Sequence, residues 1–148
     1  MSLYEIAEKA VELNAEKIVI IDRWKGGPGR IRFYKTSRNI ANQVLPQIYL
    51  SGVKFQRELK KFKGRRIISS LFIDEMDGNN QEVKRLKEEL SSFFGVPIMN
   101  SNDAATKYSV AMRFSVDTSG FIKISFYSLP SNVEIGPRII VSHVVWQI

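Results

Sequence analysis

Residues 17–36 decide the fold, and they read Lys17-Ile-Val-Ile-Ile-Asp22, Arg23-Trp-Lys-Gly-Gly-Pro-Gly29 and Arg30-Ile-Arg-Phe-Tyr-Lys-Thr36. The first part is a continuous apolar run rich in β-branched residues, which predicts a strand buried on both faces. The glycines and the proline of the second part predict a loop. The third part alternates, with Ile31 and Phe33 facing one way and the polar residues the other. The stretch therefore predicts a β-hairpin with an extended tip.

Two helices are predicted, over residues 2–14 and 81–94. Ser2 and Glu5 have the spacing of a capping box, and apolar residues follow them at the helical period. The second helix is expected to end at Gly95. Its apolar face contains Val83, Leu86, Leu90, Phe93 and Phe94.

Further strand patterns cover 47–55, 66–73, 107–116, 121–128 and 139–146, with Gly52 as a bulge candidate. Asp117–Gly120 is typical of a hairpin turn, and residues 74–80 of an acidic turn or linker. Few helices against a mixed, mostly antiparallel sheet make an α+β protein. The 148 residues fit one domain, 1–148, in which a division into halves 1–75 and 76–148 is also considered.

The net charge of +7 is unevenly distributed along the chain. Residues 1–66 hold 15 Lys and Arg against 6 Asp and Glu, whereas residues 67–148 hold 7 against 9. This asymmetry favours a polyanion as partner over a merely solubilising surface. The absence of cysteine and of a signal-like N-terminus indicates a cytoplasmic protein without disulfides. No apolar run is long enough to span a membrane.

Few residues in the sequence have the chemistry of catalysis or metal binding. His143 is the only histidine, and its alternating context is typical of a core or surface residue. Asp74, Glu75 and Asp77 lack the spacing of an EF-hand loop and are interpreted as a solvated turn. Gly26–Gly29 matches neither a Walker motif nor a dinucleotide fingerprint. We therefore expect no enzymatic activity, no metal and no cofactor.

Two basic groups are candidate RNA contacts. The first surrounds the glycine tip, where backbone amides and a tryptophan face suit phosphate and an unpaired base. The second is a dense cationic segment with interleaved phenylalanines, suited to phosphate contacts that are sensitive to salt. The first group is Arg23, Trp24, Lys25, Arg30 and Arg32, and the second is Lys54, Arg57, Lys60, Lys61, Lys63, Arg65 and Arg66. For the glycine tip, a plain hairpin turn is an equally good interpretation.

The hairpin resembles that of archaeal Brix-domain proteins, which carry a Trp-Lys-Gly-x-Pro-Gly turn followed by an Arg-Ile-x-Phe-Tyr strand. Met1–Ala7 looks like the preceding helix of that family, and Gly136-Pro-Arg-Ile139 is similar to the opening of its final strand. The resemblance is strong over 1–35 and 136–146 and weak over 40–110.

The resemblance implies two similar α/β halves, each like the anticodon-binding domain of class II aminoacyl-tRNA synthetases. It also implies a non-catalytic role in ribosomal RNA processing or subunit assembly, through contacts with ribosomal RNA or pre-ribosomal particles. The alternative is a protein–protein assembly module whose charges serve solubility only.

One feature of the family is missing from this sequence. Its members open with a strand and a helix that carry a Thr-Ser-Arg-x-Pro-Ser-like motif, before the helix that here begins at Ser2. Thr36-Ser-Arg-Asn39 is similar but follows the hairpin and lacks the proline. We therefore expect an exposed sheet edge, which would allow a homodimer or the addition of a strand from another assembly protein.

Overall fold

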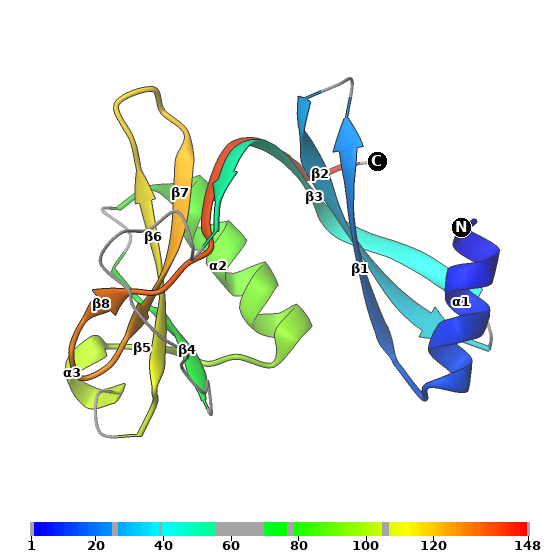
Figure 1. Ribbon diagram of the computed structural model, residues 1–148, viewed down its shortest axis with the longest axis horizontal. Coiled ribbons are helices and arrows are strands. Elements are labelled where there is room, and N and C mark those ends of the chain that lie inside the picture. Colours follow the sequence, from blue (N-terminus) through cyan, green and yellow to red (C-terminus); the bar gives the residue numbers. More distant parts are fainter. Residues whose placement is uncertain are drawn as a thin grey trace. The chain divides into compact units, whose positions relative to one another are not determined.

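The structure is a computed structural model, shown in Figure 1, that describes residues 2–24, 27–38, 40–55, 70–76, 79–104 and 107–147. The elements follow in the order α1 (Leu3–Glu12), β1 (Lys17–Trp24), β2 (Gly27–Ser37), β3 (Ile40–Lys54), β4 (Leu71–Asp74), α2 (Gln81–Phe94), β5 (Ile98–Met99), α3 (Ser101–Ala104), β6 (Val110–Val116), β7 (Ile122–Ser128), β8 (Val133–Glu134) and β9 (Arg138–Val145). The prediction of a mixed, mostly sheet architecture with few helices is confirmed.

The chain forms two compact units. Unit 1 comprises residues 1–51 and 143–148, and unit 2 comprises residues 52–142. Within the described residues, nine strands follow the order β1-β2-β3-β9-β7-β6-β4-β5, with β8 pairing to β7. No helix in this part of the chain is long and apolar enough to cross a membrane.

Unit 1 contains α1 and an antiparallel ladder of β1, β2 and β3. The predicted capping box is confirmed: Ser2 Oγ accepts from Glu5 N at 3.2 Å, and Ser2 N donates to Glu5 Oε2 at 3.0 Å. Two hydrogen bonds of Thr36 to the residues after the helix, both 2.9 Å long, fix the end of α1 beside β2.

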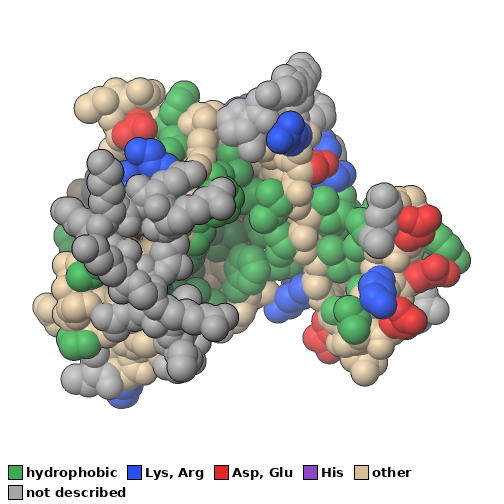
Figure 2. All heavy atoms as spheres, in the orientation of Figure 1, with side chains coloured by type: hydrophobic (Ala, Val, Ile, Leu, Met, Phe, Trp, Pro, Cys, Tyr) green, Lys and Arg blue, Asp and Glu red, His purple; other side chains and the backbone are tan. Residues whose placement is uncertain are grey.

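The prediction that the first strand is buried on both faces is wrong. Val19 is 39 % exposed and Ile21 is 68 % exposed. The reason is that β1 ends the strand order and pairs only with β2 among the described strands, so it lies at an edge. Figure 2 shows apolar side chains over the strands beside α1, whose own surface carries acidic side chains.

The hairpin tip is also shorter than predicted. Trp24 pairs with Gly27, so Gly27–Gly29 belong to β2 and do not form an open glycine loop. Gly29 has a φ of +140°, and a Cβ at this position would lie 3.1 Å from the Asp22 carbonyl oxygen. Glycine is therefore required here to let the two strands pair closely.

The strand predicted over 47–55 begins earlier, at Ile40. Its pairing with β2 changes register between Ile31, opposite Ile48, and Phe33, opposite Val44. The extra residues include Pro46, which has no N–H to contribute to a ladder. An irregular position of this kind accommodates a proline without ending the strand, which explains why sequence patterns divided it.

Unit 2 is built around β4, which pairs in parallel with both β5 and β6. β6 and β7 form an antiparallel hairpin from Val110–Ser128 to Val116–Ile122, closed by the predicted turn 117–120. Phe72, Ala104 and Ala111 form a buried cluster on this sheet. The short elements β5, α3 and β8 and the parallel pairing were not predicted.

Helix α2 has the predicted bounds, and it ends at Gly95 in the left-handed conformation. Phe94 was wrongly placed on its buried face, because this side chain is 50 % exposed. Lys87 is buried instead, and its ammonium donates to the Met76 carbonyl oxygen at 2.5 Å. The aliphatic part of a lysine can fill an apolar face when its charge finds an acceptor.

Replacing Gly29 with alanine is expected to destabilise the protein by more than about 1 kcal/mol, because alanine is strained at this φ and its methyl group meets backbone. Gly52→Ala is the matched control, since a Cβ there meets nothing within 4 Å. Urea unfolding of both variants checks the prediction, and it fails if Gly29→Ala is as well tolerated as Gly52→Ala.

Candidate functional site

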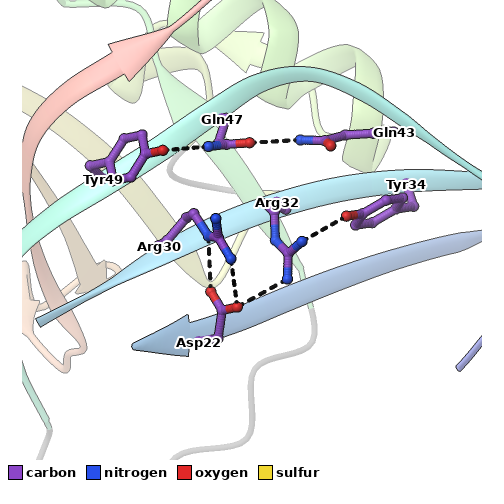
Figure 3. Close-up of polar contacts among 7 residues, drawn as sticks. All are labelled: Asp22, Arg30, Arg32, Tyr34, Gln43, Gln47 and Tyr49. Atoms are coloured by element: carbon purple, nitrogen blue, oxygen red, sulfur yellow. Dashed lines mark hydrogen bonds and ion pairs between the residues drawn. The ribbon is translucent and has the colours of Figure 1, made fainter. Parts of the chain in front are cut away.

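A polar surface lies on one face of the three strands of unit 1. In the ladder Asp22 pairs with Arg30, and Arg30 pairs with Tyr49. Because side chains alternate along a strand, residues two apart on β2 share this face with Arg30. We call the resulting group the polar face, and Figure 3 shows its members Asp22, Arg30, Arg32, Tyr34, Gln43, Gln47 and Tyr49.

Asp22 holds the two arginines of the polar face. Its carboxylate accepts from Arg30 Nε at 3.2 Å, from Arg30 Nη2 at 2.9 Å and from Arg32 Nη2 at 3.0 Å. The side chains of Arg30 and Arg32 are only 17 % and 24 % exposed. One carboxylate thus fixes two guanidinium groups and leaves the cluster with one net positive charge.

The same contacts shift the acidity of Asp22. The hydrogen bond from Arg30 is the largest cause that lowers the pKa of this carboxyl below its ordinary value, with the positive charge of Arg32 adding to it. A carboxylate held in this way stays ionised in moderately acidic solution, so the arginines keep their orientation.

Two further groups of side-chain hydrogen bonds continue the polar face. Arg32 Nη1 donates to the Tyr34 hydroxyl at 3.1 Å. Gln43 Nε2 donates to Gln47 Oε1 at 2.8 Å, and Gln47 Nε2 donates to the Tyr49 hydroxyl at 2.6 Å. Figure 3 shows these two groups along adjacent strands. The side chains are therefore oriented before any ligand arrives.

An aromatic stack lies beside these hydrogen bonds. The Tyr49 and His143 rings are 4.4 Å apart and inclined by 12°. His143 was expected to be a core or surface residue, and the structure places it at the surface. Guanidinium donors, amides and an aromatic surface on one sheet face are suited to the bases and phosphates of unpaired RNA.

The predicted contact residues have different outcomes. Arg30 and Arg32 lie together on the polar face, whereas Arg23 is exposed on β1 next to Asp22 in sequence. Lys54 is exposed at the end of β3. The side chain of Trp24 lies outside what the structure describes. The remaining candidates lie wholly outside the described residues, and they are Lys25, Arg57, Lys60, Lys61, Lys63, Arg65 and Arg66.

Sequence reasoning did not identify Asp22, Gln43, Gln47 or Tyr49 as members of the polar face. Alternation along residues 30–36 already placed Tyr34 with Arg30 and Arg32. Asp22 lies opposite Arg30 because the two strands continue pairing as far as Trp24 and Gly27. The longer loop predicted from the sequence, residues 23–29, hid this pairing. No pattern in the sequence indicated that Gln43, Gln47 and Tyr49 belong to the same face. The pairing of β3 with β2 changes register between Val44 and Ile48, so their partners on β2 cannot be read from a regular ladder.

The acidic segment differs from the predicted solvated turn. Asp74 is only 4 % exposed, at the end of β4, because Ser101 and Arg113 both donate to Oδ2. Glu75 is exposed, and Asp77 lies outside the described residues. In the part of the chain that the structure describes, no three side chains of metal-ligating type gather into a site.

Comparison with known proteins finds similarity in structure and no match in sequence. No family model matches the sequence, and no curated protein matches it. The structure is similar to the crystal structure of a probable ribosomal biogenesis protein from Aeropyrum pernix K1, with a TM-score of 0.74 and 16 % sequence identity. The match covers 98 % of this chain and 79 % of the other. The two proteins share a fold.

Replacing Asp22 with asparagine is expected to lower the free energy of unfolding by about 1 to 2 kcal/mol at neutral pH, because two part-buried guanidinium groups lose their acceptor. The pKa of Asp22 is lowered on folding, so its contribution is present above about pH 4 and is lost as the pH falls through the folded-state pKa.

The difference in unfolding free energy between the wild type and Asp22→Asn, followed from pH 7 to pH 3, tests this prediction. It should shrink below about pH 4. Asp103→Asn is the control, an exposed acidic residue with no ion pair among the described residues. A difference that stays constant across this range contradicts the role given to Asp22.

Proposed function

We propose that this protein binds ribosomal RNA and assists ribosome assembly without catalysing a reaction. The observation that carries the proposal is the polar face, where Asp22 orients Arg30 and Arg32 beside the Tyr49–His143 stack. Pre-oriented guanidinium groups can donate to phosphate or to base edges, and the stack offers a surface to an unpaired base.

Two independent observations support the proposal. The fold is shared with a protein described as a probable ribosomal biogenesis protein. The sequence carries a net charge of +7, which favours binding to a polyanion. Membership of the Brix family, and the likeness of each half to a synthetase anticodon-binding domain, belong to this proposal, as does a cytoplasmic location.

RNA binding is expected to weaken by at least about tenfold between about 50 and 200 mM salt, because cationic contacts release counterions from phosphate. His143→Ala should weaken binding of a ribosomal RNA fragment by a further factor of about ten at every salt concentration, because a stacking surface is lost. The salt slope should stay the same, since stacking releases no counterions. Fluorescence anisotropy of a labelled fragment measures both effects.

Tyr4→Ala is the matched control, since Tyr4 is an aromatic residue of unit 1 that is 69 % exposed on α1 and is not a member of the polar face. Binding should survive this change. An RNA affinity that does not change with salt, or an equal loss of affinity for His143→Ala and Tyr4→Ala, would contradict the proposal.

A second candidate function is protein–protein assembly through the edge strand. The observation that favours it is the exposure of Val19 and Ile21 on β1, which pairs only with β2 among the described strands. An edge of this kind accepts a strand from another chain or from a second copy. Ribosomal proteins retained after nuclease treatment, and lost on Ile21→Glu, would favour this function over RNA binding.

A further inference from the structure

A pocket with charged and hydroxyl side chains in a largely apolar lining lies in unit 2, on the hairpin of β6 and β7. It has a volume of about 440 Å³, and its lining includes Asp74, Arg113, Ser115, Lys123, Ser125 and Tyr127. The register explains why these side chains meet: Arg113 pairs with Ser125, and Ser115 pairs with Lys123. Residues that alternate along two paired strands share one face of the sheet.

A buried carboxylate organises the pocket. Asp74 Oδ2 accepts from Ser101 Oγ at 2.5 Å and from Arg113 Nε at 3.2 Å, and its Oδ1 accepts from Met76 N at 3.1 Å. Both oxygens of Asp74 are therefore engaged. The side chain of Asp74 is 6 % exposed and that of Arg113 is 27 % exposed, so the arginine reaches the pocket while its partner stays buried.

The arginine is held from two further sides. Its Nη1 donates to Asn132 Oδ1 at 2.5 Å. Its guanidinium carbon lies 4.6 Å from the centre of the Tyr127 ring, in a cation–π contact. These contacts leave Arg113 Nη2 without an acceptor among the described residues, and they fix its orientation.

The other donors of the pocket are also unused. Within the described ranges, the Lys123 ammonium forms no ion pair, and the hydroxyls of Ser115 and Ser125 make no hydrogen bond. Ser125 is only 3 % exposed, so its hydroxyl gains a partner only from something inside the pocket. With the charges of Asp74 and Arg113 balanced, Lys123 leaves one net positive charge.

We propose that this pocket binds a phosphate group. Ammonium, guanidinium and hydroxyl donors converge there, and phosphate offers oxygens that accept from all of them. The volume falls within the range of pockets that bind small molecules, about 300 to 1,000 Å³. The phosphate belongs either to a free nucleotide or to the backbone of an RNA chain, and the second source rests on the proposed function.

The test uses NMR spectra of the full-length ¹⁵N-labelled protein. Inorganic phosphate, uridine 5′-monophosphate, an oligouridylate RNA and phosphate-free uridine are titrated separately. The amides of residues 113–115 and 123–127 should shift with the phosphate-bearing probes and not with uridine. Response to the monophosphate but not the oligomer identifies a free nucleotide as the ligand, and the reverse result identifies an RNA backbone.

The variants test the role of the lysine. Lys123→Met should weaken phosphate binding at the pocket by about tenfold, because one charge-assisted contact is lost. Lys123→Arg should retain binding. Lys107→Met is the matched control, since Lys107 is exposed in the same unit and does not line the pocket. The amide spectra also report whether each variant is folded.

The proposal is overturned if uridine shifts the pocket amides as much as its monophosphate does. It is equally overturned if folded Lys123→Met binds phosphate like the wild type, or if the shifts lie elsewhere. RNA that binds the polar face, with neither inorganic phosphate nor the monophosphate nor the RNA shifting the pocket amides, overturns the pocket alone. Phosphate that shifts the pocket, without any RNA binding to the protein, overturns only the proposed function.

Discussion

The pairing of one carboxylate with two arginines organises the surface on which the functional account depends. Asp22 receives three hydrogen bonds from Arg30 and Arg32, and these bonds align the guanidinium groups along the sheet. Without that acceptor, two part-buried cations would repel each other and turn towards solvent. The close strand pairing that brings Asp22 opposite Arg30 depends in turn on Gly29, the residue that permits the backbone contact.

Unit 2 repeats the same arrangement with different residues. Asp74 on β4 holds Arg113 on β6, and Tyr127 lies against the guanidinium. In unit 1 the corresponding tyrosine is Tyr34, at 5.9 Å from the Arg32 guanidinium carbon. Each unit therefore presents an arginine that a carboxylate and a tyrosine hold on a sheet face.

Both units carry a net positive charge. Unit 1 holds eight basic and five acidic residues, and unit 2 holds fourteen basic and ten acidic residues.

Local signals predicted the parts of the fold that local contacts determine. The capping box at Ser2, the bounds of α2 and the turn at 117–120 depend on residues three or four positions apart, and all three were predicted correctly. The exposure of β1 depends on which strands lie beside it. The parallel pairing of β4 depends on residues far away in sequence. Neither is visible in a single stretch of sequence.

The candidate site could be predicted only in part, for the same reason. Arg30 and Arg32 were identified from charge and alternation, whereas Asp22, Gln47 and Tyr49 enter through the register of neighbouring strands. The buried Asp74 illustrates the point most clearly. Its acidic neighbours predicted a solvated turn, but its partners Ser101 and Arg113 lie 27 and 39 positions further along the chain.

Photo-crosslinking of the full-length protein to a ribosomal RNA fragment, followed by mass spectrometry of the crosslinked peptides, tests the central claim most directly. The account predicts crosslinks in the peptides that contain Tyr49 and His143, and their loss when excess unlabelled RNA competes. Efficient crosslinks confined to α1, or RNA binding that leaves both of these peptides unmodified, would contradict it.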